Sequence, residues 1–276
     1  MNILPNECVY EILVLTNIKD LLLCGQTSSI LHNLCYLKSL WENKIDSKFH
    51  NIFKKETCYK NCKTFYQLQK LKKKLSLTYE IDFLYNREEV NVYDRGLTKI
   101  PSEIIQLINL KRISFPINLL KEISLEIVQL TNLVSLSFTR NNLIKIPSEI
   151  KQLINLKGLY CDKNELEEIP PEIGHLINLT NLNLSDNKLI KIPPEIGQLT
   201  NLTQLNLGFN QLRELPKEIK QLKRLVDLYL PYNKLKEFTI DTDDLPYLKT
   251  ISLQNNDSIE VKIKKKKSLN TLAINC

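Results

Sequence analysis

The stretch LTNLNLSDNKLIKIPPEIGQLTN, residues 179–201, contains the pattern that decides the fold of most of this chain. Asparagines recur at a constant step, at positions 118, 141, 164, 187, 210, 233 and 256. Apolar residues keep the same period at three further positions of each unit, which are 179, 182 and 184 in this one. The constant spacing of these residues indicates a protein built from stacked supersecondary units.

The two halves of the unit predict different local structures. The alternation of Leu182 and Leu184 with polar residues predicts a short strand whose leucines point inward. Asn187 turns the chain, and its amide can hydrogen-bond the backbone of neighbouring units in a buried ladder. Pro193 opens a turn or short helix on the opposite side, whose isoleucine and leucine pack back onto the strand leucines.

The shared pattern LxxLxLxxNxLxxIPxEIxxLxx resembles the typical leucine-rich repeat. The resemblance implies an α/β solenoid, a leucine-rich-repeat horseshoe with a parallel concave sheet, which serves binding. Weaker copies extend the array over residues 87–276, with about eight repeats in all. Arg95 takes the asparagine position in the first repeat. Leu269, Leu272 and Ile274 continue the spacing at the other end, after a unit that the pattern makes two positions shorter than the others.

The positions that flank the inward leucines line the concave face, and small polar residues dominate them. Aromatic and charged residues stand out there, and interfaces favour aromatic side chains and Arg. We predict partner binding through Arg112, Arg140, Tyr160, Asp162, Asp186, Phe209, Asp227, Tyr229 and Tyr232. The alternative is a face that is merely solvated, with Phe209 and Tyr232 tucked against neighbouring residues.

Residues 1–48 carry a different pattern, LPNECVYEILVLTNIKDLLLCGQTSSILHNLCYLKSLWENKI from Leu4 to Ile45. The spacing of its apolar residues predicts a small all-α domain of three short helices, the first opened by Leu-Pro. A segment this short and apolar cannot bury all of its leucines internally. We therefore expect a partner to cover some of them.

This segment resembles an F-box. The matching positions are Leu4, Pro5, Glu11, Ile12, Leu13, Leu15, Asp20, Leu21, Leu22, Ser28, Leu34, Leu40 and Trp41. The resemblance implies that a Skp-type adaptor binds Leu4, Pro5, Ile12, Leu13, Leu21, Leu22, Leu31, Leu34 and Trp41. The family often has Trp at the position of Leu31 and Val at that of Thr27, and the smaller Leu31 would weaken adaptor binding by about 1–2 kcal/mol.

A spacer over residues 49–86 separates the F-box-like segment from the repeats. It contains a predicted helix over residues 64–75, with Phe65, Leu68, Leu71 and Leu75 on one face. An F-box followed by a spacer and repeats is similar to the F-box/leucine-rich-repeat family, in which the F-box grips the adaptor of a cullin ubiquitin ligase and the repeats hold the substrate. The resemblance implies a substrate-recognition subunit that is monomeric outside the complex and has a protein substrate. The alternative is a stand-alone leucine-rich-repeat scaffold whose N-terminal helices are a cap.

Charge and hydropathy argue against nucleic acid and membrane as partners. The formal charge of +7 is modest for 276 residues, and the lysines gather at 72–74 and within 262–267. The alternative for the second run is a nuclear-targeting or nucleic-acid patch, but a lysine run at the end of a solenoid is more often a solvated edge, and these lysines lack the interleaved aromatic residues of a nucleic-acid site. The sequence has no apolar run of about 18 residues, the length that would suggest a membrane span. Seven cysteines, an odd number, favour a reducing compartment, so we expect a cytoplasmic protein, with the nucleus as the alternative.

The sequence contains no combination of residues that indicates a catalytic site. Cys58 and Cys62 lie near His50 but lack the second pair that structural zinc needs. Cys161 takes an inward leucine position, where a thiol is buried and inert. No glycine-rich phosphate loop occurs. We therefore expect neither a cofactor nor an enzymatic activity.

Overall fold

The computed structural model describes residues 67, 68, 70–77, 87–241, 243–256, 259–264 and 273–275. The chain divides into two compact units, Met1–Arg87 and Glu88–Cys276. The F-box-like segment 1–48 lies outside the described residues, so its helices stay a prediction. The boundaries of the three predicted segments, 1–48, 49–86 and 87–276, stay predictions as well.

The described part of the first unit is the end of one helix. Residues 67, 68 and 70–74 are helical, and Leu68, Leu71 and Leu75 are buried, in agreement with the predicted apolar face. The helix ends at Ser76, whose φ is 50°. The N–H of Leu77 then donates to the carbonyl of Lys72 at 2.9 Å, which is the hydrogen bond that commonly closes a helix after a left-handed residue.

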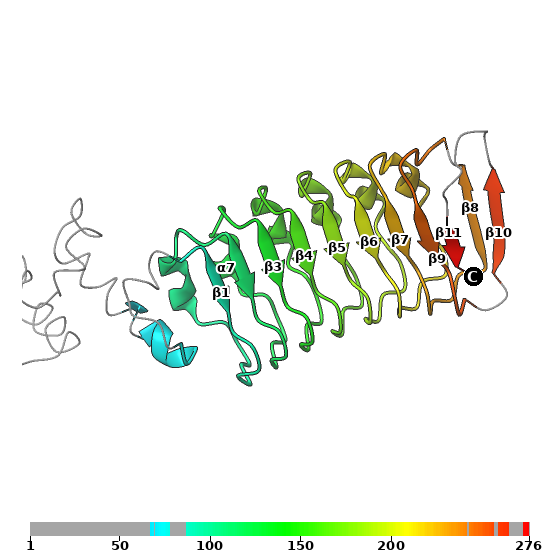
Figure 1. The fold of residues 1–276 in the computed structure, drawn as a ribbon. Helices are drawn as coiled ribbons and strands as arrows, with labels where there is room; N and C mark the ends of the chain where they lie inside the picture. The colour runs from blue at the N-terminus through cyan, green and yellow to red at the C-terminus, as the bar shows by residue number, and fades with distance from the viewer. Residues whose placement is uncertain are drawn as a thin grey trace, which may run out of the picture. The chain divides into compact units, whose positions relative to one another are not determined.

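The second unit is built on a parallel sheet with one strand from each coil (Figure 1). In spatial order its strands are β1 (Glu89–Asn91), β2 (Arg112–Ser114), β3 (Ser135–Ser137), β4 (Gly158–Tyr160), β5 (Asn181–Asn183), β6 (Gln204–Asn206), β7 (Asp227–Tyr229), β9 (Thr250–Ser252) and β11 (Ala273–Asn275). Paired residues such as Leu136 and Leu159 stand one sequence period apart, so the period is the sheet register. The predicted parallel sheet of a leucine-rich-repeat solenoid is therefore confirmed for this unit.

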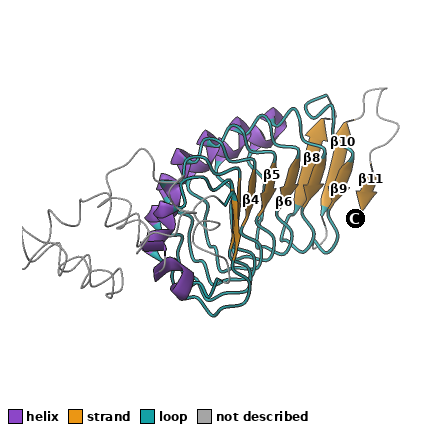
Figure 2. Ribbon diagram, turned by 60° about the vertical axis from the view of Figure 1, so that its left-hand side comes forward, coloured by secondary structure: helices purple, strands orange, loops and turns teal. Residues whose placement is uncertain are grey.

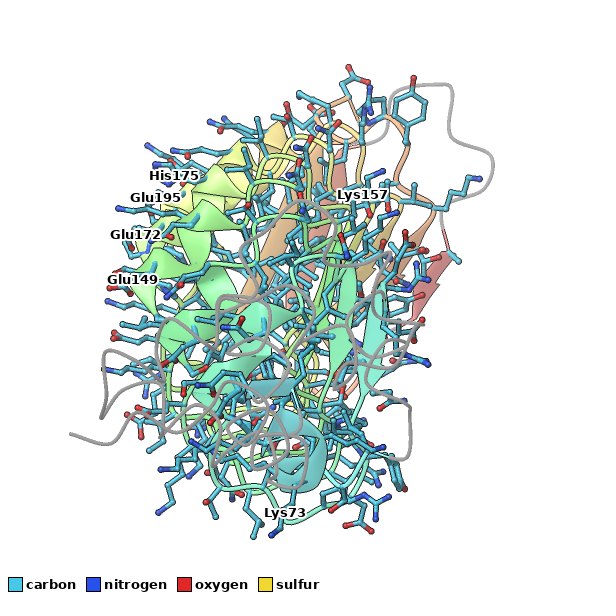
Figure 3. The ribbon with its side chains drawn as sticks, turned by 90° about the vertical axis from the view of Figure 1, so that its left-hand side faces the viewer. Lys73, Glu149, Lys157, Glu172, His175 and Glu195 are labelled. Atoms are coloured by element: carbon cyan, nitrogen blue, oxygen red, sulfur yellow. The ribbon has the colours of Figure 1, made fainter. Side chains whose placement is uncertain are left out.

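Short helices cover the side of the coils opposite the sheet (Figure 2). Five are 3-10 helices and one is an α-helix: η2 (Ser102–Gln106), α7 (Leu125–Val128), η3 (Ser148–Gln152), η4 (Pro171–His175), η5 (Pro194–Gln198) and η6 (Lys217–Gln221). Each 3-10 helix follows a proline with φ between −63° and −69°, because the pyrrolidine ring pre-sets the entry conformation. Glu149, Glu172 and Glu195 occupy the same position in three successive 3-10 helices on this side (Figure 3).

The core lies between the sheet and the helices and consists of the periodic leucines and isoleucines. Leu159, Leu205 and Leu228 on the sheet and Ile173 and Ile196 on the helices are all fully buried. Each such side chain contributes about 1.5–3 kcal/mol relative to exposure. One coil alone could not cover these side chains, so burial depends on the stacking of neighbours.

The buried asparagines form the predicted ladder between coils. Nδ2 of Asn164 donates to the carbonyl of Phe138 in the preceding coil at 2.9 Å and to that of Cys161 in its own coil at 3.0 Å. Its Oδ1 accepts the N–H of Leu143 at 2.9 Å. At the first coil Oδ1 of Asn118 accepts the N–H of Leu97 at 3.1 Å, as the other buried asparagines do, and also the N–H of Arg95 at 3.0 Å.

A second ladder of asparagines runs along the turns before the strands, and it was not predicted. Nδ2 of Asn155 donates to the carbonyl of Thr131 at 3.0 Å, and Nδ2 of Asn178 to that of Ile154 at 2.8 Å. These side chains are exposed, so each bond is weaker in net terms than its buried counterpart. The ladder adds one further link between successive coils.

The last coils depart from the pattern on the helical side. There β8 (Glu237–Asp241) and β10 (Glu260–Lys264) replace the helices and pair in parallel. Both segments alternate polar and apolar residues and lack the proline that starts a 3-10 helix, so an extended conformation is favoured. The first lysines of the 262–267 run therefore belong to a strand at the edge of a sheet, where charged residues discourage unwanted pairing.

The register of the final strand differs from the expected one. The pattern predicted a shortened unit, which would align Leu272 with Ile251. Instead Ile274 pairs with Ile251, so the last step has the same length as the other steps. The β10 strand pairs with β8 at this same step, Val261 with Phe238, and thereby restores the full length of the coil.

Candidate functional site on the concave face

The concave face is formed by the strand side chains that point away from the core. In β5, Asn181 and Asn183 are half-buried on either side of buried Leu182, as the pleat of a strand requires. Polar side chains join neighbouring coils across this face. Oγ1 of Thr139 donates to Oδ1 of Asp162 at 2.9 Å, and Nδ2 of Asn181 donates to Oε1 of Gln204 at 3.0 Å. The face is thus a pre-ordered polar surface.

One residue of each described coil has a left-handed backbone, directly before the buried asparagine or, in the first coil, before Arg95. These residues form a column, which we call the left-handed column: Asp94, Ile117, Arg140, Lys163, Asp186, Phe209, Tyr232 and Asn255, with φ between 49° and 56°. Non-glycine residues other than Asn and Asp rarely adopt this conformation. The column holds four of the predicted site residues, and it was not foreseen because its side chains share no chemistry.

Phe209 and Tyr232 stack on each other in the left-handed column. Their ring centroids are 4.3 Å apart, and their planes are inclined by 13°. Each side chain nevertheless stays about half exposed, at 50% and 49%. Stacking of such a pair contributes about 0.5–1.5 kcal/mol. The rings are therefore tucked against each other, yet they present apolar surface to solvent.

Tyr160 and Tyr229 lie on the sheet itself and are half-buried. A Cβ atom on Gly158 would lie only 2.9 Å from the Tyr160 ring, so glycine makes room for this ring over β4. Gly208 allows a similar approach, because a Cβ there would lie 2.9 Å from the ring of Pro231. Gly208 and Pro231 directly precede Phe209 and Tyr232 in the sequence.

The charged residues of the predicted set do not form one cluster. Nε of Arg112 pairs with Oε2 of Glu89 at 3.1 Å, on the first two strands of the sheet. Asp227 is half-buried on β7, whereas Arg140 and Asp186 lie in the left-handed column. The structure therefore brings together the aromatic pair and leaves the charges distributed along the face.

Cys161 is not a nucleophile in this setting. Its side chain is fully buried at the predicted inward position. Burial raises the pKa of the Cys161 thiol far above its usual range, and the charge of Asp162 raises it further. A thiol in this state stays protonated at neutral pH and does not react.

Other predicted features fall partly or wholly outside the described residues. The nine adaptor-binding residues, Leu4, Pro5, Ile12, Leu13, Leu21, Leu22, Leu31, Leu34 and Trp41, all lie there, as do Cys58, Cys62 and His50. The described ranges contain no group of three His, Cys, Asp or Glu side chains that could hold a metal ion. Over the same ranges, none of the helices has the length and hydropathy to span a membrane.

Comparison with known proteins agrees with the geometry of the coils. A family model described as leucine rich repeat matches residues 154–212 and 177–235. The repeats of this chain are leucine-rich repeats. They form a protein-interaction scaffold. No curated protein is significantly similar to this chain in sequence.

Two solved leucine-rich-repeat structures are similar to this chain. A leucine-rich-repeat protein of Leptospira interrogans is 33% identical over 68% of this chain and 52% of its own, with a TM-score of 0.55. The ectodomain of the plant membrane receptor kinase GASSHO1/SCHENGEN3 from Arabidopsis thaliana, in complex with CASPARIAN STRIP INTEGRITY FACTOR 2, is 30% identical over 59% of this chain and 22% of its own, with a TM-score of 0.53. This chain thus spans about half of the first protein and less than a quarter of the second.

Proposed function

We propose that the concave face binds a protein, with its strongest contacts near Phe209 and Tyr232. The observation that carries this proposal is the half-exposed aromatic stack on a left-handed backbone. Neither folding preference nor core packing requires aromatic residues there, because the conformation disfavours them and half of each side chain faces solvent. Exposed aromatic side chains on a rigid frame are the usual anchors of interfaces.

The neighbouring residues supply the polar part of such an interface. Tyr229 and Asp227 lie on β7, and Asp186 adjoins Phe209 in the left-handed column. A mixture of aromatic anchors and polar groups is typical of protein-binding surfaces. Arg112 already pairs with Glu89 and lies on β2, far along the sheet from β7, so we assign it to the rim of the interface.

This proposal can be tested with the full chain as bait. Phe209→Ala combined with Tyr232→Ala should lose a specific set of co-purified proteins in quantitative mass spectrometry. Tyr247→Ala is the matched control, because Tyr247 is 64% exposed and lies before β9, away from the column. Equal recovery of every co-purified protein by the double variant and the control would refute the assignment. A fall in melting temperature of more than about 5 °C for the double variant alone would assign the rings to folding instead.

We further propose that the chain is the substrate-recognition subunit of a Skp/cullin/F-box ubiquitin ligase. The support is the Leu-Pro to Leu-Trp spacing from Leu4 to Trp41, which matches an F-box, followed by repeats that can hold a protein substrate. In this role the chain would act in the cytoplasm or nucleus, would be monomeric outside the complex, and would leave the transfer of ubiquitin to other subunits. A scaffold without any ligase role is the competing function.

The two functions differ in adaptor binding. The full chain and its Leu13→Asp, Leu21→Asp double variant should be compared in pull-downs from a eukaryotic lysate. A ligase subunit recovers Skp and cullin with the unmodified chain and loses them with the variant, because charged residues would replace apolar contacts. Recovery of neither protein, or of both in equal amounts by the two chains, would favour the scaffold function. The circular dichroism of the variant controls for loss of the coils.

A further inference from the structure

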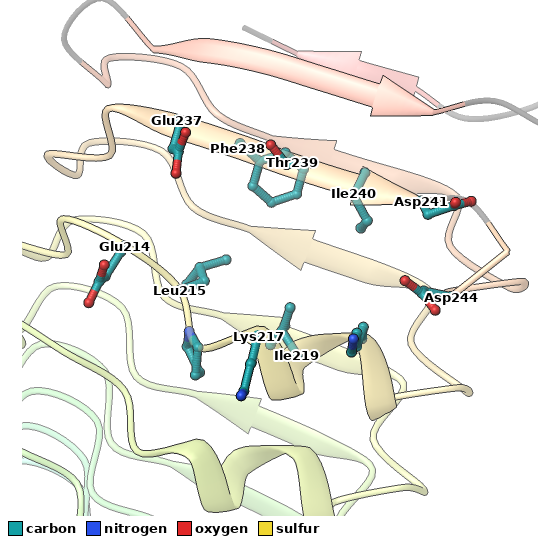
Figure 4. A pocket seen from close by; sticks show the side chains of 12 residues that line it. Glu214, Leu215, Lys217, Ile219, Glu237, Phe238, Thr239, Ile240, Asp241 and Asp244 are labelled. Carbon is teal, nitrogen blue, oxygen red and sulfur yellow. The ribbon is translucent and has the colours of Figure 1, made fainter.

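A groove lies on the helical side of the solenoid, between η6 and β8. Its volume is about 450 Å³, and it is formed where the coil that carries a strand follows one that carries a 3-10 helix. Figure 4 shows Leu215 and Ile219 on one wall and Phe238 and Ile240 on the other. The two walls therefore differ in secondary structure and leave space between them.

The wall formed by β8 turns main-chain groups toward the groove. The N–H of Glu260 donates to the carbonyl of Lys236 at 2.9 Å, and Glu237 is in register with Glu260. In a parallel ladder the groups of alternate residues face the partner strand. The main-chain N–H and carbonyl groups of Phe238 and Ile240, and the carbonyl of Lys236, thus face β10. The main-chain groups of Glu237 and Thr239 face the groove.

No hydrogen bond is formed by the main chain of Glu237 or Thr239 with the described residues of the opposite wall, 213–220. The carbonyl of Asp241, further along, accepts the N–H of Asp244 at 2.9 Å. An open strand edge is a template for an additional strand. The groove thus combines such an edge with an open volume of about 450 Å³ beside it.

Side chains of an added strand would alternate between two environments. Those on the same side as Phe238 and Ile240 would meet the half-buried Leu215 and Pro216 of the opposite wall. Those on the other side would lie beside Glu237, which is exposed on the edge strand. Cross-strand pairs of this kind are the contacts that stabilise a sheet.

The charge of the groove indicates which polar residues an added strand would carry. Four acidic residues line it, Glu214, Glu237, Asp241 and Asp244, against two basic residues, Lys217 and Lys220, and Asp244 also pairs with Lys223 at 3.6 Å, which leaves a small excess of negative charge. The excess of negative charge favours a basic segment and disfavours an acidic one. The lining thus specifies alternate apolar and basic residues.

We propose that this groove binds an extended segment of a partner protein, which adds to the edge of β8 as a third strand and alternates apolar residues with Lys or Arg. Main-chain hydrogen bonds to Glu237 and Thr239 give the affinity, and the apolar walls with the acidic rim give the specificity. The site lies on the side opposite the concave face, so it is independent of the binding surface proposed above. A charged edge that only prevents aggregation would leave the groove without a ligand.

The probe for this site is a fluorescent peptide of about eight residues, the length of an ordinary strand, in which Val and Lys alternate. In fluorescence anisotropy the peptide should bind the full chain saturably, with half-saturation at a chain concentration below about 1 mM. A matched peptide with Glu in place of each Lys should bind at least about tenfold more weakly, because of the acidic rim. Absence of saturable binding, or equal binding of both peptides, would overturn the proposal.

The variant that separates strand addition from general stickiness is Thr239→Pro, with Thr239→Val as its control. Proline removes an N–H that faces the groove and has no main-chain partner among the described residues, so the edge should tolerate it. The valine variant keeps the N–H. We expect Thr239→Pro to weaken the Lys peptide at least about tenfold and Thr239→Val to leave it unchanged. Equal affinities for the two variants would refute strand addition.

Hydrogen exchange keeps the test decisive if Thr239→Pro also disturbs β8. In the unmodified chain, the Lys peptide should slow exchange of the Glu237 and Thr239 amides, because both become hydrogen-bonded. Unchanged exchange at these amides in the presence of saturating peptide would overturn the proposal. The Phe209→Ala, Tyr232→Ala variant should bind the peptide as the unmodified chain does. A loss of binding there would place the peptide on the concave face and would refute the groove site.

Discussion

The coils with 3-10 helices and the coils with β8 and β10 have the same concave side and different opposite sides. In both regions the strands pair at the same step in sequence, and a buried asparagine links each coil to the one before. In the first region Pro-x-Glu-Ile starts a 3-10 helix, whereas alternating residues in the second form a pair of strands. The comparison indicates that the strand and the asparagine set the register, and that the other half of the coil can change its secondary structure without altering it.

The largest expected effect tests whether the asparagine ladder sets the register. Asn164→Ala should lower the free energy of unfolding by about 4 kcal/mol, because three carbonyls and one N–H lose their hydrogen-bond partner. Urea denaturation followed by circular dichroism measures the change. Asn142→Ala, at an exposed neighbouring position, should stay within about 0.5 kcal/mol of the unmodified chain. Similar losses for both variants would contradict a special role of the buried amide.

A second prediction compares the two kinds of coil directly. Ile196 on η5 and Ile240 on β8 both point into the core, with 0% and 5% exposure. Substitution of either by Ala should cost about 3 kcal/mol, because it removes buried methyl groups and leaves a cavity. The measurement is again urea denaturation. A loss below about 1 kcal/mol at Ile240 alone would mean that the strand side is packed more loosely than the helical side.

The third prediction concerns the buried thiol of the central coils. Because the folded-state pKa of Cys161 is raised, the folded chain keeps its proton at a pH where the unfolded chain loses it. The contribution of Cys161 to the free energy of unfolding is therefore fully present below the unfolded-state pKa of about 8.5. It falls by about 1.4 kcal/mol per pH unit above that pKa. The stability difference between the unmodified chain and Cys161→Ala should therefore shrink from pH 8 upward. A pH-independent difference would contradict the raised pKa, as would rapid alkylation of Cys161 in the folded protein at pH 8.

The smallest effect separates the two asparagine ladders. Asn178→Ala removes one exposed hydrogen bond, 2.8 Å long, to the carbonyl of Ile154. The carbonyl left behind can bind water, so the loss should be about 0.5–1 kcal/mol. A value as large as that of Asn164→Ala, measured under the same conditions, would make the exposed ladder an equal determinant of the stack.

The sequence predicted those parts of the fold in which one residue type recurs. Leucine at the inward positions, Asn164 and its equivalents, and the prolines before the helices each have one physical role in every coil, so the period alone exposed them. The register of Ile274 was predicted wrongly, because two apolar spacings compete at the C-terminal end and the pairing of β10 with β8 decides between them.

The candidate site was less accessible to sequence reasoning. Phe209 and Tyr232 were singled out as aromatic residues among polar ones, but their stacking and their left-handed backbone need coordinates. The groove beside β8 was not predicted, because the change from a 3-10 helix to a strand at Glu237–Asp241 leaves the period of the repeat unaltered. Whether these residues bind a partner stays a prediction.

The side chains of the left-handed column can be varied without changing the bonds that hold its backbone. The bend at Arg140 is held by its neighbours, since Nδ2 of Asn141 donates to the carbonyl of Phe138 at 3.0 Å across it and the main-chain N–H of Arg140 donates to the carbonyl of Asp162. The Arg140 side chain itself takes no part in these bonds. A library randomised only at this position of each coil should therefore yield mostly folded proteins with altered ligand preferences, so that affinity can be selected without re-optimising the scaffold.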